Sequence, residues 1–133
     1  MLTDLAGFVA ASYRRGVPYI KVPTTLMGYV DASIGIKTGV NYNGNKNRLG
    51  AFHAPQTVLL DKAFLKTQPR RHVVNGVCEI LKLAIVKDAE LFQLLETHGA
   101  KSIEAHFQDE QGGIILDARG ISSPTKRSTA SST

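Results

Sequence analysis

The residues best suited to chemistry lie in one stretch, 31–55. It combines a carboxylate (Asp31), two lysine amines (Lys37 and Lys46) and asparagine amides with glycines and interleaved apolar residues. Glycine lets a backbone approach a ligand closely, and lysine ammonium groups act as point charges on phosphate. A connecting segment this long is usually functional or disordered, and its apolar residues favour order. We interpret 31–55 as an anion-binding active-site loop; the alternative is a glycine-rich surface connection whose lysines face water.

A second group of chemically active side chains lies on a predicted long helix, 69–86. Between Val73 and Val86 the strongly polar residues are Asn75, Glu79 and Lys82, and their spacing places them on one narrow stripe. Because apolar residues cover the other faces, we expect this helix to be buried. Buried Glu and Lys are rare unless they are paired or functional. The stripe is therefore either part of a site or an i, i+3 ion pair that neutralises itself.

The elements around these residues are typical of an α/β protein. Ligands of α/β proteins usually bind at a sheet edge where a strand is followed by a hydroxyl-rich turn and the start of a helix, as at Thr24 and Thr25. N-capping explains at least one of these threonines without any ligand. The pattern predicts helices at 4–15, 26–30, 88–97 and 100–107, strands at 19–22 and 57–61, the second of them buried, and a helical turn at 62–67. After residue 108 the helical pattern decays, with a break at Gly112 and Gly113.

Composition restricts the class of protein. The 133 residues carry a net charge of +5 and are 43% hydrophobic, which suits one domain with a real core. No apolar run approaches the roughly 18 residues of a membrane span, and there is no basic signal region, so we expect a cytoplasmic protein with no membrane partner. The single cysteine excludes an internal disulfide. Basic residues are scattered in pairs and aromatics make up 7%, so nucleic-acid binding is the least favoured hypothesis.

Four segments resemble one enzyme family. DLAGFVAASYRRGVPYIKVPTTL (4–26), VDASIGIKTGVN (30–41), KNRLGAF (46–52) and NGVCEILK (75–82) are similar to the central part of the sugar phosphate cyclases, the 3-dehydroquinate synthase superfamily. The likeness runs from about Asp4 to about Phe107. Within the superfamily, GIKTGVN and KNRLGAFHAP look more like the 2-epi-5-epi-valiolone synthase branch than like the dehydroquinate synthases.

This resemblance implies a reaction, its cofactors and a domain arrangement. A ketoheptose phosphate such as sedoheptulose 7-phosphate would be cyclised with loss of phosphate, through transient oxidation by NAD, elimination and aldol closure. The enzyme would be a carbon–oxygen lyase that needs NAD and zinc (or cobalt) and forms a homodimer. Residues 1–68 would be the end of an NAD-binding α/β domain, 69–120 the start of a helical metal and substrate domain, and 121–133 a disordered tail.

The resemblance also implies a role for each matching residue. Glu79 would be a zinc ligand, and Arg15 would reach a substrate phosphate, while Arg48 has no assigned role. The expected substrate contacts are Asp31, Lys37, Asn47 and Lys82. The expected lining of the NAD site is Asp4, Thr24, Thr25, Lys46, Thr67 and Asn75.

Some parts of the family pattern have no counterpart in these residues. A glycine-rich dinucleotide turn should precede Asp4, and two zinc histidines should follow Phe107. A catalytic zinc takes three protein ligands, whereas the matching positions supply only Glu79. Cys78 also stands where alanine is usual. We therefore expect the middle third of such an enzyme, inactive by itself. The alternatives are part of a 3-dehydroquinate synthase of the shikimate pathway or a non-catalytic remnant that binds a partner or phosphate through its basic loop.

Overall fold

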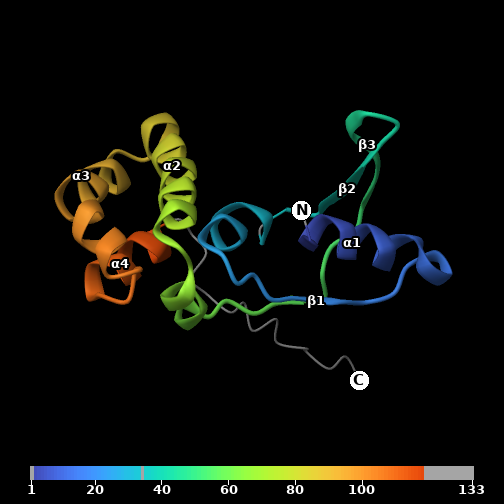
Figure 1. Ribbon diagram of the computed structural model, residues 1–133, viewed down its shortest axis with the longest axis horizontal. Coiled ribbons are helices and arrows are strands. Elements are labelled where there is room, and N and C mark those ends of the chain that lie inside the picture. Colours follow the sequence, from blue (N-terminus) through green and yellow to red (C-terminus); the bar gives the residue numbers. More distant parts are fainter. Residues whose placement is uncertain (1, 34, 119–133) are drawn as a thin grey trace, which may run out of the picture.

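The computed structural model describes residues 2–33 and 35–118 (Figure 1). The predicted tail, 121–133, lies outside these residues, as do residues 119 and 120. The elements in chain order are α1 (Leu2–Ser12), η1 (Tyr13–Arg15), β1 (Ile20–Lys21), η2 (Gly28–Ala32), β2 (Lys37–Tyr42), β3 (Asn45–Phe52), β4 (Thr57–Val58), η3 (Lys62–Thr67), α2 (Arg70–Lys87), α3 (Ala89–Glu104) and α4 (Glu110–Leu116). In Figure 1, α2, α3 and α4 gather at one end and α1 lies with β2 and β3 at the other. The result is a small mixed α/β structure.

The predicted loop 31–55 is wrong for most of its length, because β2 and β3 form an antiparallel hairpin there. Asn43 and Gly44 connect the strands with φ angles of 49° and 74°. Two central residues with positive φ define a type I′ turn, which matches the twist of paired strands. The overlooked signal was this Asn-Gly pair after the alternating residues Val40 and Tyr42. The segment is therefore ordered, as expected, but as a hairpin instead of an irregular loop.

Helix α1 packs against the hairpin through its smallest residues. Gly7 and Ala10 are buried on this face. A Cβ at Gly7 would come within 2.5 Å of Thr38 Cγ2 on β2, so the close approach requires glycine. The predicted helix 4–15 is confirmed with one change: its last turn is the 3₁₀ segment η1, and Gly16 ends it with a φ of 110°. This packing holds the hairpin beside the N-terminal residues of α1.

The two predicted strands that flank the hairpin are shorter than expected. β1 pairs in parallel with β4 over two residues each. Beyond this pair, the predicted buried strand 57–61 is wrong, since Leu59 is exposed and only Val58 and Leu60 are partly buried. Extended backbone that has no neighbouring strand forms no inter-strand hydrogen bonds. The length of these strands is therefore set by pairing and not by local propensity.

The hydrophobic core lies among η2, η3 and the three C-terminal helices. Its buried apolar residues are Leu26, Tyr29, Val30, Leu65, Val73, Ile80, Ala84, Leu91, Leu95, Phe107, Ile115 and Leu116. Residues from both predicted segments, 1–68 and 69–120, thus share one core. The boundary between the segments remains a prediction.

The expectation that α2 is buried all round is wrong. Its buried residues, Val73, Gly76, Ile80 and Ala84, lie on one face. On the far side, Ile85 is 66% exposed and Val86 69% exposed. Burial of a helix depends on what packs against it, and in the described part of the chain only one face is covered. Of the polar stripe, Asn75 and Lys82 are exposed and Glu79 is partly buried, so the stripe is not inside the molecule.

Two glycine positions misled the prediction of the last helices. The predicted helices 88–97 and 100–107 are one helix, α3, which continues through the buried Gly99. Helix α4 likewise runs through the predicted break. A Cβ at Gly112 would lie 2.8 Å from Phe107 Cα, so the close packing there requires glycine. Glycine costs a helix only about 1 kcal/mol relative to alanine, which tertiary packing outweighs. Among the described residues, none of the helices has the length and apolar character needed to cross a membrane.

Candidate functional site

Asp31 and Lys37 are the two residues shared by three adjoining cavities. Asp31 lies on η2, a π-helical turn, and Lys37 is the first residue of β2, where it pairs with Phe52. Both side chains are exposed. π-helical turns occur frequently at functional sites because they turn a side chain away from the regular helical position. The residues that complete them distinguish a threonine cavity, a hairpin cavity and a helix cavity.

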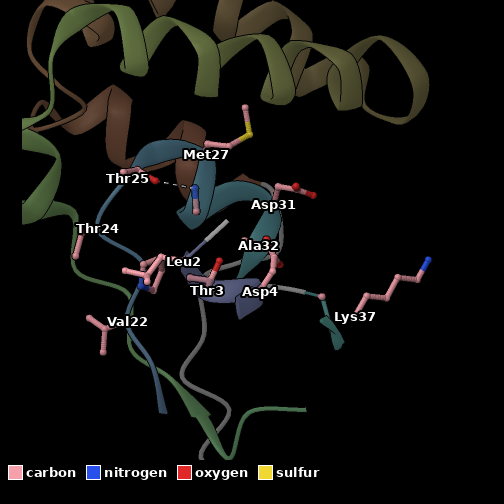
Figure 2. A pocket seen from close by; sticks show the side chains of 13 residues that line it. Leu2, Thr3, Asp4, Val22, Thr24, Thr25, Met27, Asp31, Ala32 and Lys37 are labelled. Carbon is pink, nitrogen blue, oxygen red and sulfur yellow. Dashed lines mark hydrogen bonds between the residues drawn. The ribbon is translucent and has the colours of Figure 1, made fainter. Parts of the chain in front are cut away.

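The threonine cavity has a volume of about 630 Å³ and brings Asp4, Thr24 and Thr25 to Asp31 and Lys37. Figure 2 shows Thr24 on one side of this cavity, with Asp31 and Lys37 on the other. The Thr25 hydroxyl accepts a hydrogen bond from the backbone N–H of Gly28 at 3.1 Å. N-capping thus explains Thr25 without a ligand, as the sequence predicted for at least one of the two threonines. The cavity brings together three residues expected to line an NAD site.

The hairpin cavity, of about 620 Å³, adds Lys46 and Asn47 from β3 to Asp4, Asp31 and Lys37. Asn47 has a φ of 52°, in the left-handed region that asparagine tolerates better than most residues. Its backbone N–H donates to the Asn41 side-chain oxygen at 3.0 Å, beside an irregularity in the strand register. Non-glycine residues held in this region cluster at functional sites.

The helix cavity, of about 560 Å³, brings Glu79 and Lys82 of α2 to the same two residues. The amine of Lys82 donates to the carboxylate of Glu79. The Lys82 side chain is 61% exposed, so the predicted buried Glu–Lys stripe is corrected to a half-open ion pair. The pair nevertheless borders a cavity that is also lined by η2 and by the first residue of β2. The ion-pair interpretation of the stripe is therefore confirmed for Glu79 and Lys82. The two residues also border this cavity, and their part in a functional site stays a prediction.

Three predicted site residues lie apart from these cavities. Arg15 ends η1 in a left-handed conformation with a φ of 69°. Thr67 lies at the end of η3, where its hydroxyl donates to the Phe64 carbonyl at 3.3 Å. Asn75 is exposed on α2. None of these three is among the residues lining the threonine, hairpin or helix cavities.

Lys21 is a candidate functional residue that the sequence did not identify. It is 6% exposed, and its amine donates to the carbonyl oxygens of Ala32 at 2.8 Å and Gly35 at 3.2 Å. Burial lowers its pKa, an effect that the nearby carboxylate of Asp4 partly offsets. The apolar neighbour Ile20 points outward instead. In a strand, successive side chains face opposite sides, so only one of Ile20 and Lys21 can be buried. Hydrophobicity predicts that Ile20 is the buried one, whereas the structure buries Lys21.

Tyr19 and His53 form a second unforeseen contact. Their rings stack with centroids 5.5 Å apart. The Tyr19 hydroxyl donates to the His53 carbonyl at 3.1 Å, and His53 Nε2 donates to the Val17 carbonyl at 2.9 Å. Burial, and then the carboxylate of Asp4, raise the pKa of Tyr19. The pair ties the end of β3 to the chain entering β1.

The donors in this part of the chain do not complete a zinc site. No three His, Cys, Asp or Glu residues come together around a potential metal position within residues 2–33 and 35–118. The helix cavity offers the carboxylates of Asp31 and Glu79, and Glu79 is already paired with Lys82. Because a catalytic zinc takes three protein ligands, these residues could contribute to such a site but cannot form it alone.

Comparison with known proteins identifies relatives of the chain. The profile described as "3-dehydroquinate synthase N-terminal" matches residues 1–75. A 2-epi-5-epi-valiolone synthase from Actinoplanes sp. is 57% identical over 112 residues, which cover 84% of this chain and 28% of that enzyme. The chain therefore spans little more than a quarter of the length of this relative.

Solved structures give the same result. The 2-epi-5-epi-valiolone synthase ValA from Streptomyces hygroscopicus subsp. jinggangensis 5008, with NAD⁺ and Zn²⁺ bound, superposes with a TM-score of 0.85 at 51% identity, over 89% of this chain and 33% of ValA. A 2-deoxy-scyllo-inosose synthase complexed with carbaglucose-6-phosphate, NAD⁺ and Co²⁺ gives a TM-score of 0.57 at 37% identity, over 59% of this chain and 22% of that one. The expected α/β fold and the expected cofactors, NAD with zinc or cobalt, are those of these structures.

Proposed function

Because the chain belongs to the 3-dehydroquinate synthase family of sugar phosphate cyclases, we propose that it provides the substrate-binding middle of a 2-epi-5-epi-valiolone synthase. The substrate would be sedoheptulose 7-phosphate, and the reaction a cyclisation with loss of phosphate. The single observation that carries this proposal is that Asp31 and Lys37 border all three cavities, where they meet the predicted NAD residues, the hairpin amides and the Glu79–Lys82 pair.

Each of these residues has a group suited to one part of a sugar phosphate. The amines of Lys37 and Lys82 supply cations for the phosphate, and charge-assisted hydrogen bonds of this kind are roughly twice as strong as neutral ones. The carboxylate of Asp31 accepts hydrogen bonds from sugar hydroxyls, and the amide of Asn47 both donates and accepts. Their placement around adjoining cavities would orient the carbon that loses phosphate.

The threonine cavity is the proposed place for part of NAD. Asp4, Thr24 and Thr25 offer a carboxylate and hydroxyls around about 630 Å³, which suits the hydroxyls of a ribose. When bound, NAD supplies reversible hydride transfer, which acidifies the carbon beside the oxidised hydroxyl. Glu79 would be one ligand of the metal, for which the described residues do not supply a complete set of ligands.

The valiolone branch is favoured over dehydroquinate synthase by the hairpin sequence. GIKTGVN and KNRLGAFHAP lie on and around β2 and β3, whose residues line the hairpin cavity. The Actinoplanes relative and ValA are both 2-epi-5-epi-valiolone synthases. Activity on the substrate of dehydroquinate synthase would instead assign the chain to the other branch.

A chimera tests the proposal. Residues 4–107 would replace the corresponding part of the Actinoplanes enzyme, and phosphate release from sedoheptulose 7-phosphate would be followed with NAD and zinc present. We expect turnover by the chimera and none by the 133-residue chain alone, which should also retain no zinc after dialysis. Lys37→Ala or Lys82→Ala in the chimera should abolish phosphate release, whereas Lys101→Ala, an exposed lysine on α3, should not.

Two outcomes would contradict the proposal. A folded chimera that binds NAD but releases no phosphate would remove the assigned substrate. Near-normal release from Lys37→Ala and Lys82→Ala would remove these amines from the site, whatever the substrate.

A further inference from the structure

The buried amine of Lys21 connects β1 to the turn that carries Asp31 and leads into Lys37. It contacts the carbonyl oxygens of Ala32 and Gly35, at 2.8 and 3.2 Å. Ala32 directly follows Asp31, and Gly35 precedes Lys37 by two residues. One acceptor thus lies at the end of η2 and the other lies shortly before β2.

This contact supplies what the local backbone lacks. The last carbonyl groups of a helical turn have no partner within the turn, and a cation at this end also interacts favourably with the helix dipole. Within the described residues, Ser33 closes η2 from the same end through its hydroxyl, which donates to the Tyr29 carbonyl. Lys21 acts further along, on two carbonyls that the hairpin ladder does not engage.

A buried amine at this position is costly without such partners. Removing an ammonium group from water costs far more than removing a methylene chain, and it is tolerated when hydrogen bonds compensate. An apolar residue would fill the same strand position at no such cost, and Ile20 and Val22 on either side are exposed instead. The inverted pattern therefore indicates that the amine itself is required.

We propose that Lys21 is a positioning residue that fixes the separation of Asp31 and Lys37 by binding the Ala32 and Gly35 carbonyls. This inference rests on the proposed function, since those two side chains are the ones assigned to the sugar phosphate. Lys21 does not itself line the threonine, hairpin or helix cavity. Its effect on binding is exerted through the backbone.

The test uses the 133-residue chain, with inorganic phosphate as the probe and hydrogen exchange as a readout that needs no ligand. Lys21→Met should accelerate exchange of the amides between residues 28 and 40 and weaken phosphate binding, each by about fivefold or more, since it removes two charge-assisted hydrogen bonds. Amides in the buried faces of α2 and α3 should exchange as in the parent. Lys21→Arg should restore both properties, and Lys101→Met, with the same loss of charge on an exposed helix position, should alter neither.

A double-mutant comparison separates positioning from general stabilisation. In a Lys37→Met background there is no Lys37 amine to place, so adding Lys21→Met should weaken phosphate binding by less than about twofold. The proposal would be overturned if the two substitutions weakened phosphate binding independently, so that the double variant lost the product of the two single losses. It would also be overturned if amide exchange at residues 28–40 were unchanged, or if amides throughout α2 were accelerated equally. If the parent chain binds no phosphate, the proposed phosphate site fails, and the local exchange result alone decides whether Lys21 orders this turn.

Discussion

The Lys82 amine donates a hydrogen bond to the Glu79 carboxylate one helical turn earlier, at the edge of the cavity that Asp31 and Lys37 also line. These four side chains carry two positive and two negative formal charges. In the proposed site, an incoming phosphate would therefore compete with Glu79 for the Lys82 amine. The pair would then link stability, anion binding and metal binding on one face of α2.

Neutralising Glu79 should strengthen phosphate binding. Glu79→Gln keeps the size of the side chain but removes the charge that holds Lys82, so the affinity of the 133-residue chain for inorganic phosphate should rise about two- to fivefold. Calorimetric titration at low salt measures this. Glu96→Gln, on α3, is the matched control and should leave the affinity unchanged. Weaker binding in Glu79→Gln would show that this carboxylate supports the anion site instead of competing with it.

Loss of Lys82 should affect binding far more than folding. Because its side chain is 61% exposed, the ion pair contributes no more than about 1 kcal/mol to the free energy of unfolding. We expect Lys82→Met to change urea unfolding by less than this amount while weakening phosphate binding about fivefold or more. A large loss of stability with unchanged binding would reverse the assignment and make the pair purely structural.

The same substitution at two buried helix glycines should have opposite effects. At Gly76 of α2, a Cβ would lie 2.5 Å from Leu26 Cγ, so Gly76→Ala should lower the free energy of unfolding by about 1–3 kcal/mol. At Gly99 of α3, the nearest contacts of a Cβ are ordinary, at 3.8 Å or more. Gly99→Ala should therefore raise stability by about 0.5–1 kcal/mol, since alanine is the better helix former. Urea unfolding of the two variants side by side checks this, and equal signs would refute the packing described for α2.

The hairpin turn should depend on residues that accept positive φ. Gly44→Val places a β-branched residue at a φ of 74° and should cost about 1–2 kcal/mol. Asn43→Gly, at a φ of 49°, should be tolerated. Hydrogen exchange of the β2 and β3 amides measures the opening of the hairpin directly. If both variants exchange alike, the turn has another conformation.

The stability of the protein should depend on pH through Lys21. Its pKa is lowered by burial, so between the folded-state pKa and the ordinary value of 10.5 the unfolded chain holds a proton that the folded protein has released. Stability therefore rises with pH in this window. The difference in unfolding free energy between the parent and Lys21→Met should shift in favour of the parent as the pH approaches 10.5.

Two tyrosines act in the opposite direction. Burial raises the pKa of Tyr19 and Tyr29 above the ordinary value of 10.0. The unfolded chain therefore releases these protons first, and the free energy of unfolding falls as the pH rises above 10. Subtracting the Lys21→Met curve from that of the parent cancels this effect, because both proteins keep the tyrosines. A flat difference curve would mean that the Lys21 amine is not buried in solution.

Local signals in the sequence were sufficient for the bounds of η3 and α2, for the start of α3 and for the family. Asp61 and Asp88 accept hydrogen bonds from the Ala63 and Leu91 amides, so the starts of η3 and α3 follow from capping, which needs only neighbouring residues. The motifs on and around β2, β3 and α2 identified the sugar phosphate cyclases, and comparison confirms this family. The sequence alone also showed which chemical groups the candidate site offers, namely those of Asp31, Lys37, Glu79 and Lys82.

Only the tertiary structure decided how these pieces meet. One-sided burial of α2 and continuation of α3 through Gly99 depend on contacts between distant residues, whose energies exceed local propensities. The pairing of β2 with β3 is different, because the Asn43-Gly44 turn signalled it locally and was overlooked. The sequence could not indicate that Lys21 would be buried while Ile20 is exposed, since hydrophobicity predicts the reverse. Side-chain chemistry is a property of each residue, whereas the distance between an acid on η2 and an amine on β2 is a property of the packed chain.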